Sequence, residues 1–341
     1  MVSSRVVQPV SFDSGLQDQY VKMWRDQGFV VLDGLLSPGL FQGALDEVDE
    51  VFERNLNPDQ VEELARSADF GSGGMMEFPC PMANVNLLTL AKPIIKMAKA
   101  CLGTDDIRLI QGDAWCKYGA SRTFSKEHNR DQRMHMDYGN NTMLHPPKWS
   151  DPEVVSCIVS FDDTDETGGG TGVVARQGDD DELYQWPYMA MPGMGKHPWV
   201  NSKDAELEYF KENDPEIYQL RLKLYEREQV AHYRPGSVLF YRHDLWHRGT
   251  PLLPGKVRRV LNLGFRKASS EWVTTWNQGW VRAMYDKEKF VEQLFPKLDV
   301  EQLSCLGFPP PKHPFWTTEN FAAVKARWEA WGMDMTPYAP H

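Results

Sequence analysis

The sequence contains few cysteines, and no two of them stand in the C-x-x-C spacing of a zinc or redox motif. The five lie scattered along the chain, at Cys80, Cys101, Cys116, Cys157 and Cys305. An odd number without paired spacing argues against a disulfide framework and against a zinc knuckle. We therefore expect reduced cysteines and a cytoplasmic location.

Positive charge is also scarce, because 48 Asp and Glu outnumber 37 Lys and Arg and give a formal net charge of −11. Nucleic-acid binding and binding to anionic membranes both need a basic face, so both functions are disfavoured. No stretch approaches about 18 uncharged apolar residues, and neither end of the sequence carries an apolar signal segment or a peroxisomal address. We expect a small-molecule partner and no membrane or nucleic-acid partner, while nothing in the sequence indicates the oligomeric state.

Core-forming residues are plentiful, since 41% of the 341 residues are hydrophobic. Residues 1–105 read mainly as helices, with Ser37 and Pro38 at one helix start and Gly103 at one helix end. Residues 106–270 read as short strands separated by Gly and Pro signals, which predicts an antiparallel sandwich or barrel. A helical insertion at about 179–232 would cover one mouth of this β core. A tryptophan-rich helical tail at 271–341 would serve in packing first and as a lid second. We expect one domain over residues 1–341, mainly β with flanking helices.

His135 and Asp137 stand two positions apart in the segment RMHMDYGNN. In a strand successive side chains alternate between faces, so the two would point the same way. Such a pair offers one nitrogen and one oxygen to a metal, and a distant third histidine completes the 2-His-1-carboxylate triad of non-haem iron(II) enzymes. The alternative is a buried histidine beside a surface aspartate. His247, at the end of a predicted strand, is the candidate third ligand. His243 competes with it, but its neighbours indicate a strand end in solvent.

Arg258 and Asn262 fall on one face of the strand predicted from RRVLNLGF. The other face consists of Leu261, Leu263 and Phe265. The apolar face suits packing against helices, whereas a charge and an amide in a central strand need a ligand to justify them. Arg258 could bind the distal carboxylate of a dicarboxylate bidentately. Arg259 competes for that role, and a salt bridge at the sheet edge is the other interpretation of Arg258.

These motifs together resemble the phytanoyl-CoA dioxygenase family of iron(II)- and 2-oxoglutarate-dependent oxygenases. The resemblance runs from DQGFVVLDGLLSPG through HMD and DETGGGTGVVARQGD to PGSVLFYRHDLWHRGTP and RRVLNLGF. Its most specific feature is His247 followed eleven positions later by Arg258, which selects Arg258 over Arg259. The resemblance implies a double-stranded β-helix, also called a jelly roll or cupin-like core, with N-terminal and C-terminal helices. It implies that His135, Asp137 and His247 bind iron and that Arg258 binds the far carboxylate of 2-oxoglutarate.

Further pocket residues are expected from their places beside these motifs. For the cosubstrate the candidates are Lys117, Gln111 and Thr250. For the substrate the candidates are Tyr138, Trp115, Trp246 and Asn262. Large aromatic residues also serve as ordinary core, which is the competing interpretation of the tyrosine and the two tryptophans.

The function implied by the resemblance is oxidation of an unactivated C–H bond with O2, while 2-oxoglutarate is converted to succinate and CO2. The carboxylate of Asp137 favours hydroxylation, desaturation or cyclisation over halogenation, because halogenating relatives have a small residue there. The acidic composition favours a neutral or cationic metabolite over a CoA thioester. Two alternatives remain: a catalytically silent metabolite-binding jelly roll, and a cupin-like metalloenzyme that does not use 2-oxoglutarate. The latter would need extra ligands, and His128 and His145 read as surface or outer groups.

Overall fold

The computed structural model describes residues 5–52, 57–66, 75–120, 131–138, 149–186, 190–270, 292, 295–300, 303 and 308–340. Its N-terminal part comprises β1 (Arg5–Val7), β2 (Val10–Ser11), η1 (Ser14–Leu16), α1 (Gln17–Gln27), β3 (Phe29–Asp33), α2 (Pro38–Val51), α3 (Pro58–Arg66), β4 (Met75–Glu77), α4 (Ala83–Thr89) and α5 (Lys92–Leu102). As expected, this part is mainly helical. The predicted boundary signals are in place, with Pro38 in the first turn of α2 and Gly103 in the left-handed conformation after α5.

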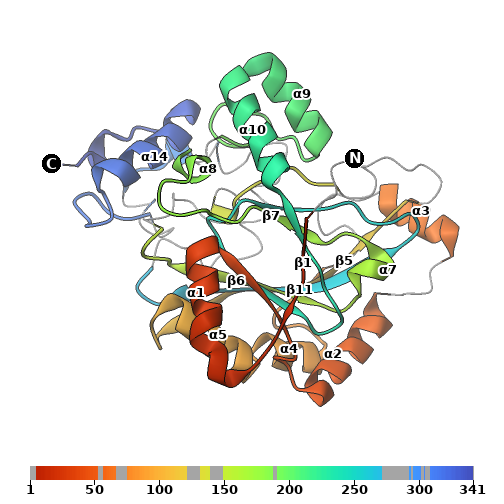
Figure 1. The fold of residues 1–341 in the computed structure, drawn as a ribbon. Coiled ribbons are helices and arrows are strands. Elements are labelled where there is room, and N and C mark those ends of the chain that lie inside the picture. Colours follow the sequence, from red (N-terminus) through yellow and green to blue (C-terminus); the bar gives the residue numbers. More distant parts are fainter. Residues whose placement is uncertain are drawn as a thin grey trace.

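The central part contains most of the strands. It comprises β5 (Ile107–Tyr118), β6 (Val154–Ser160), α7 (Thr164–Thr167), β7 (Thr171–Val173), α8 (Glu182–Gln185), α9 (Lys203–Asn213), α10 (Pro215–Arg227), β8 (Gln229–Ala231), β9 (Val238–Arg242), β10 (His247–Gly249) and β11 (Val257–Lys267). A seven-stranded sheet has the order β2-β3-β9-β6-β11-β5-β4, and a four-stranded sheet has the order β1-β8-β7-β10. The two sheets with helices on either side give the expected jelly roll (Figure 1).

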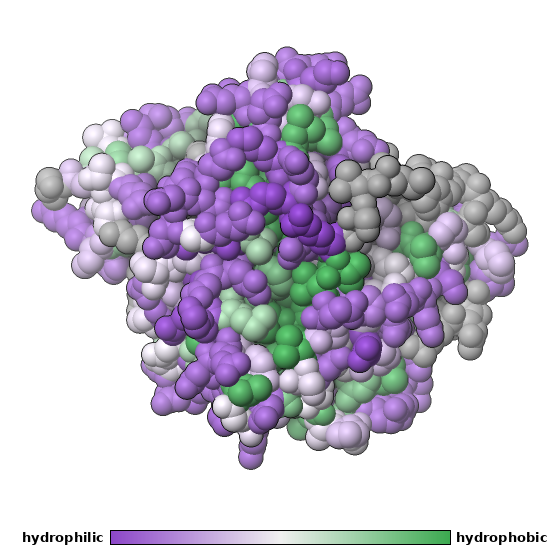
Figure 2. Space-filling model, in the orientation of Figure 1, coloured by the Kyte–Doolittle hydropathy of each residue, from purple (hydrophilic) through white to green (hydrophobic). Residues whose placement is uncertain are grey.

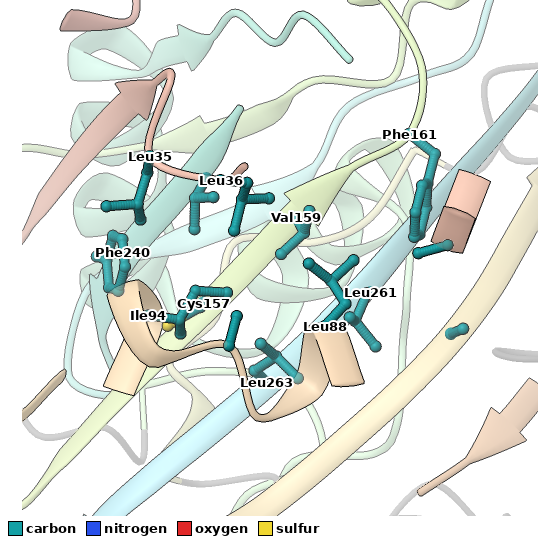
Figure 3. Close-up of a cluster of buried hydrophobic side chains, with 14 of the residues drawn as sticks. Leu35, Leu36, Leu88, Ile94, Cys157, Val159, Phe161, Phe240, Leu261 and Leu263 are labelled. Carbon is teal, nitrogen blue, oxygen red and sulfur yellow. The ribbon is translucent and has the colours of Figure 1, made fainter. Parts of the chain in front are cut away.

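The larger sheet packs one face against the N-terminal helices. In Figure 1, α1, α2, α4 and α5 all lie on this side of the sheet. Leu261 and Leu263 of β11 are buried in one apolar cluster with Leu88 of α4 and Ile94 of α5 (Figure 3). Each such side chain contributes roughly 1.5–3 kcal/mol by leaving water. The predicted division of β11 into an apolar face and a polar face is therefore confirmed, and the polar face is left to the interior between the sheets.

The predicted insertion is helical over most of its length, in α8, α9 and α10, but its end is a strand. β8 pairs with β1 in parallel and with β7 antiparallel, so the chain returns to the smaller sheet before residue 232. In Figure 1, α9 and α10 stand above the smaller sheet, on the side opposite α1, α2, α4 and α5. Figure 2, in the same orientation, shows mostly hydrophilic residues in the region of α9 and α10. Apolar residues gather in the middle of the face that this figure shows.

The C-terminal tail lies partly outside the described residues, and Trp272 and Trp276 are among those not described. Its described elements are η2 (Phe295–Lys297), α14 (Thr318–Trp328), η3 (Glu329–Trp331) and η4 (Thr336–Tyr338). Phe295 stacks on Trp328 with ring centroids 4.5 Å apart, and both belong to a cluster that also contains residues of α9 and α10. The tail thus packs as predicted, while its role as a lid and the single-domain organisation stay predictions. No helix among the described residues is long and apolar enough to span a membrane.

Candidate active site

His135 and His247 come together from two different parts of the chain. The backbone N–H of His135 donates to the carbonyl of His247 at 2.8 Å, and the reverse bond is 2.9 Å. This bridge is isolated, so the expected strand around His135 is wrong. The chain is already helical at Asp137, whose N–H donates to the carbonyl of His243 at 2.9 Å. The imidazole of His135 and the carboxylate of Asp137 point the same way because the β-bridge at His135 is followed by helical backbone at Asp137. Strand alternation is not the cause.

Asp137 lies between the two imidazoles. Its Oδ1 is 3.7 Å from Nε2 of His135 and 3.5 Å from Nε2 of His247. Two ligand atoms bound to one metal ion at about 2.1 Å each can be no more than roughly 4.2 Å apart, so both separations allow a shared ion. All three side chains are buried. The group can therefore hold a divalent cation with one oxygen and two nitrogen ligands.

The other polar atoms of these three side chains already have hydrogen-bond partners within the protein. Nδ1 of His135 lies 3.0 Å from the carbonyl of Arg133, and Nδ1 of His247 lies 3.0 Å from the carbonyl of Leu245. A carbonyl can only accept, so in the neutral ring Nδ1 carries the proton and the lone pair on Nε2 faces Asp137. The hydroxyl of Tyr241 donates to Oδ2 of Asp137 at 2.8 Å, which leaves Oδ1 for a ligand. These contacts fit a metal centre.

The charges at this group also suit a cation. Burial lowers the pKa of His135 well below its ordinary value, so this ring is neutral and able to ligate. Burial alone would raise the pKa of Asp137, but the attraction and hydrogen bond of His247 outweigh it and lower the pKa overall. The same pairing raises the pKa of His247 against the effect of its burial. The carboxylate is therefore ionised and negative at neutral pH.

The segment before His135 is held by the insertion. The hydroxyl of Tyr225 in α10 accepts from the N–H of Met134 at 3.0 Å, and a guanidinium nitrogen of Arg221 donates to the carbonyl of Met134. Arg221 and Glu206 of α9 are completely buried and paired at 2.7 Å. The insertion thus fixes the residue next to a candidate ligand, in addition to the covering role that the sequence predicted for it.

Arg258 is a buried cation on the cavity side of β11. Only 4% of it is exposed, and within the described part of the chain it forms no ion pair, while its Nε has no hydrogen-bond partner. Its guanidinium lies 5.6 Å from the ring centre of Tyr233, and burial lowers its pKa. Arg259 points the other way, where Asp162 accepts from its Nη2 at 2.7 Å and Asp49 also pairs with it. The two arginines are thus separated by the two faces of β11.

One cavity joins the three candidate ligands to Arg258. Lys117 and Gln132 also line it, and Nζ of Lys117 donates to Oε1 of Gln132 at 3.3 Å. Gly249 lies in the same wall, next to both of these side chains. The cavity therefore combines a metal-binding group with positive charge at one end, as the binding of a small keto acid would require.

The family model described as phytanoyl-CoA dioxygenase (PhyH) matches residues 24–260. The chain belongs to this family. Two solved structures of similar fold are those of EctD from S. alaskensis in its apoform and of the epimerase SnoN in complex with Fe3+, alpha ketoglutarate and nogalamycin RO. EctD is 12% identical, with 81% of this chain and 87% of that chain covered and a TM-score of 0.51. SnoN is 14% identical, with 75% and 85% covered and a TM-score of 0.50. A comparison with curated proteins gave no match.

Membership of the phytanoyl-CoA dioxygenase family identifies the protein as an oxidoreductase that uses iron and 2-oxoglutarate. The residues present fit both groups. The two imidazoles and the carboxylate supply the donor set of non-haem iron, and the buried Arg258 has no ion-pair partner among the described residues, a place that a dicarboxylate would fill.

The other residues predicted for the site divide into two sets. Those that line the cavity are Lys117, Gln111, Trp115 and Asn262. Thr250 lies outside its lining and donates to the carbonyl of Gly170 at 2.7 Å. Trp246 lies in an apolar cluster and donates to the carbonyl of Leu183 at 2.9 Å, and Tyr138 packs with Ile110 and Val154. His128 and His145 lie outside the described residues.

The prediction that His243 lies in solvent is wrong. Only 1% of it is exposed, and burial lowers its pKa to about 4. It does not belong to the group of possible metal ligands among the described residues, and its contribution is the carbonyl that accepts from Asp137. The sequence interpretation failed because the short turn after β9 is covered by the 131–138 segment, which comes from far away in the chain.

Several cavity residues were not predicted. The principal ones are Tyr241, Gln132, Arg248, Thr171 and Ile158. For Tyr241 a signal was available, since alternation along β9 places it on the same face as Leu239, away from Phe240 of the helix-facing core. For Gln132 no local signal existed, because it enters the cavity through an irregular segment.

Proposed function

We propose that the protein is a 2-oxoglutarate-dependent hydroxylase of a small-molecule metabolite, built as one oxygenase domain over residues 1–341. It would insert oxygen into an unactivated C–H bond and release succinate and CO2. The observation that carries this proposal is the buried Arg258, which forms no ion pair with any described residue and lies in the same cavity as His135, Asp137 and His247. A buried guanidinium without a partner is costly, and a bound dicarboxylate removes that cost.

In this proposal His135 and His247 bind the iron through Nε2, and Asp137 binds it through Oδ1. When bound, iron supplies the site for oxygen activation with electrons from the keto acid. The backbone carbonyls of Arg133 and Leu245 hold the two rings in the required tautomer, and Tyr241 holds the carboxylate. Because Asp137 is a carboxylate and no small residue stands in its place, hydroxylation is favoured over halogenation.

Arg258 would bind the distal carboxylate of 2-oxoglutarate as a two-point hydrogen-bond donor, with Lys117 close by on the neighbouring strand. Gln132 orients Lys117 and also accepts from the N–H of Gly249 at 3.0 Å. Thr250, which holds Gly170 in place, is proposed to support this end of the cavity without direct contact.

The test is an anaerobic titration of the apoprotein with iron(II) and then 2-oxoglutarate, followed through the visible absorption band of a keto acid chelated to iron. The wild type should develop the band. His135→Ala should lose it, and Arg258→Ala should require at least about tenfold more 2-oxoglutarate, since a charged hydrogen-bond pair is worth roughly 1.5–3 kcal/mol. Arg234→Ala, which removes an arginine whose side chain is 63% exposed, is the matched control.

Two results would contradict the proposal. A band of unchanged 2-oxoglutarate dependence in Arg258→Ala would remove the arginine from the cosubstrate site. Iron binding without any band in the wild type would favour a metalloenzyme that does not use 2-oxoglutarate. Once the band is established, candidate metabolites can be screened by succinate release, and hydroxylation is checked by incorporation of one labelled oxygen atom from 18O2 into the product.

A further inference from the structure

Asp113 is a buried carboxylate without a cation. It lies in β5 and is only 4% exposed. The amide of Gln111 donates to its Oδ2 at 2.8 Å, but its Oδ1 has no hydrogen-bond partner, and no Lys, Arg or His of the described residues pairs with it. Burying an unpaired acceptor of this kind costs free energy that the fold does not recover through its own contacts.

Asp113 lies directly behind the cavity wall, next to three residues that line the cavity. Alternation along β5 places it on the same face as Gln111 and Trp115, which are two residues away on either side and both line the cavity. Its cross-strand partner in β11 is Asn262, which lines the cavity as well. Directly opposite residues on one face of an antiparallel pair have Cβ atoms about 4.5–5.5 Å apart. The carboxylate of Asp113 and the amide of Asn262 are therefore neighbours across the two strands, and the amide lies in the cavity wall.

Asn262, like Asp113, has an unsatisfied hydrogen-bond acceptor in its side chain. Its Oδ1 is buried and has no hydrogen-bond partner among the described residues. Two residues paired across the strands thus each have an acceptor oxygen without a donor among the described residues. A second acidic group is near, because Glu77 of β4 is the partner of Asp113 on its other side. Burial, together with the charge of Glu77, raises the pKa of Asp113 to about 7, and a bound cation would relieve both effects.

This acidic group is separate from the end proposed to bind 2-oxoglutarate. Arg258 is paired in register with Lys117, four residues along β11 from the pairing of Asn262 with Asp113. Four residues of strand span roughly 13 Å. Arg258 and Lys117 therefore supply positive charge at one end of this strand pair, whereas the carboxylate of Asp113 lies behind the wall at the other end and disfavours a dicarboxylate there.

We propose that Asn262 and Gln111 in the cavity wall, together with the carboxylate of Asp113 directly behind them, form the substrate subsite and that the substrate presents a protonated amine to it. An ammonium group carries only donors and one positive charge, which matches a carboxylate oxygen and an amide oxygen that both lack a donor. This inference rests on the proposed function, because it assigns the substrate of the same cavity. A neutral polyol would match the two acceptors but not the charge.

The test uses the anaerobic holoenzyme with iron(II) and 2-oxoglutarate and three probes of one shape: cyclohexylammonium, cyclohexanol and cyclohexanecarboxylate. Binding is measured by isothermal titration calorimetry. We expect the ammonium to bind at least about tenfold more tightly than either of the others, as a charge-assisted hydrogen bond allows. Asp113→Asn should abolish that preference, and Asn262→Ala should reduce it. Glu216→Gln, which removes one exposed negative charge in the first turn of α10, is the control and should keep it.

The 2-oxoglutarate band is recorded for every variant. If the band forms but the ammonium shows no preference, or if the preference survives Asp113→Asn, the amine subsite is refuted while the enzyme class stands. Stronger binding of the alcohol or the carboxylate refutes it as well, and so does a lack of binding by all three probes. If the band itself fails in the wild type, the proposed function fails first.

Discussion

The imidazole rings of His135 and His247 face each other with their centroids 4.4 Å apart, and the two residues exchange both backbone hydrogen bonds. Backbone hydrogen bonds thus hold together two residues that are more than a hundred positions apart in the sequence. This contact does not depend on a metal. The ring of Tyr241 lies 4.8 Å from that of His247, and its hydroxyl reaches Asp137. Tyr241 therefore contacts two of the three candidate ligands, one through its ring and one through its hydroxyl.

Tyr241→Phe should weaken iron binding without unfolding the protein. The ring that packs beside His247 is kept, but Oδ2 of Asp137 loses its donor and the carboxylate can rotate. Loss of such a partner behind a metal ligand typically reduces affinity about 10- to 100-fold. The measurement is competition for iron(II) against a chromophoric chelator. Tyr20→Phe removes a hydroxyl that donates to Ser11 far from the cavity, and it should have wild-type affinity. Equal affinities for the two variants would contradict the role of Tyr241.

Arg248→Met should destabilise the fold strongly. Arg248 pairs with Asp131 of the segment that carries His135 and with Glu228 before β8, and all three are poorly exposed. Removing the cation leaves two buried carboxylates facing each other, which typically costs about 3–5 kcal/mol. Urea denaturation of the apoprotein measures this loss in the free energy of unfolding. Arg234→Met, on the surface, should change it by less than about 0.5 kcal/mol. A loss of similar size in both variants would show that the buried pairing contributes nothing.

Asp113 should make the apoprotein less stable as the pH rises. Its pKa is raised in the folded state to about 7 from an ordinary value of 3.8, so between these values the folded protein binds more proton than the unfolded chain. The free energy of unfolding contributed by this group is therefore lost as the pH rises from about 4 to about 7. Asp113→Asn removes this effect. The free energy of unfolding of the variant, relative to that of the wild type, should therefore increase by up to about 3 kcal/mol between pH 5 and pH 8. Urea denaturation at the two pH values checks this, and an advantage that stays constant with pH would contradict it.

The sequence predicted the features that depend on local pattern. Alternation along β11 separated Arg258 and Asn262 from Leu261 and Leu263, and the structure places the first pair in the cavity wall and the second in the helix-facing core. The spacing between His247 and Arg258 selected Arg258, which lines the cavity, over its neighbour Arg259, which does not. The choice is physically simple, because adjacent residues of a strand must face opposite sides and Arg259 meets Asp162 on the other side.

Features that depend on distant contacts could not be predicted. The segment of His135 has the pattern of a strand, yet it forms one bridge because its neighbours bond to α10 and to the carbonyl of His243. His243 reads as an exposed strand end for the same reason, since the residues that bury it are remote in sequence. Tyr138 and Trp246 carry the aromatic character of pocket residues, but nothing in a single sequence distinguishes a pocket aromatic from one that packs in a core.

Gly249→Ala should weaken 2-oxoglutarate binding and leave stability almost unchanged. A Cβ at this position would lie 2.5 Å from Oε1 of Gln132 and 2.6 Å from Nζ of Lys117, so both side-chain ends must move. Both are flexible ends that can shift at small cost in stability, but Lys117 then leaves its place beside Arg258. We expect the KM for 2-oxoglutarate to rise by about threefold to tenfold, equivalent to the net worth of roughly one hydrogen bond.

The matched control for this change is Gly39→Ala, because an added Cβ in the first turn of α2 meets nothing within 4 Å. It should leave the KM for 2-oxoglutarate unchanged. Steady-state succinate formation at varied 2-oxoglutarate measures both variants, once a substrate is known, and the chelate band measures them before that. If Gly249→Ala binds 2-oxoglutarate as the wild type does, Lys117 does not contribute to cosubstrate binding, and Arg258 alone must neutralise the distal carboxylate. If Gly249→Ala changed kcat but not KM, the displaced side chains of Gln132 and Lys117 would instead affect the end of the cavity where the reaction takes place.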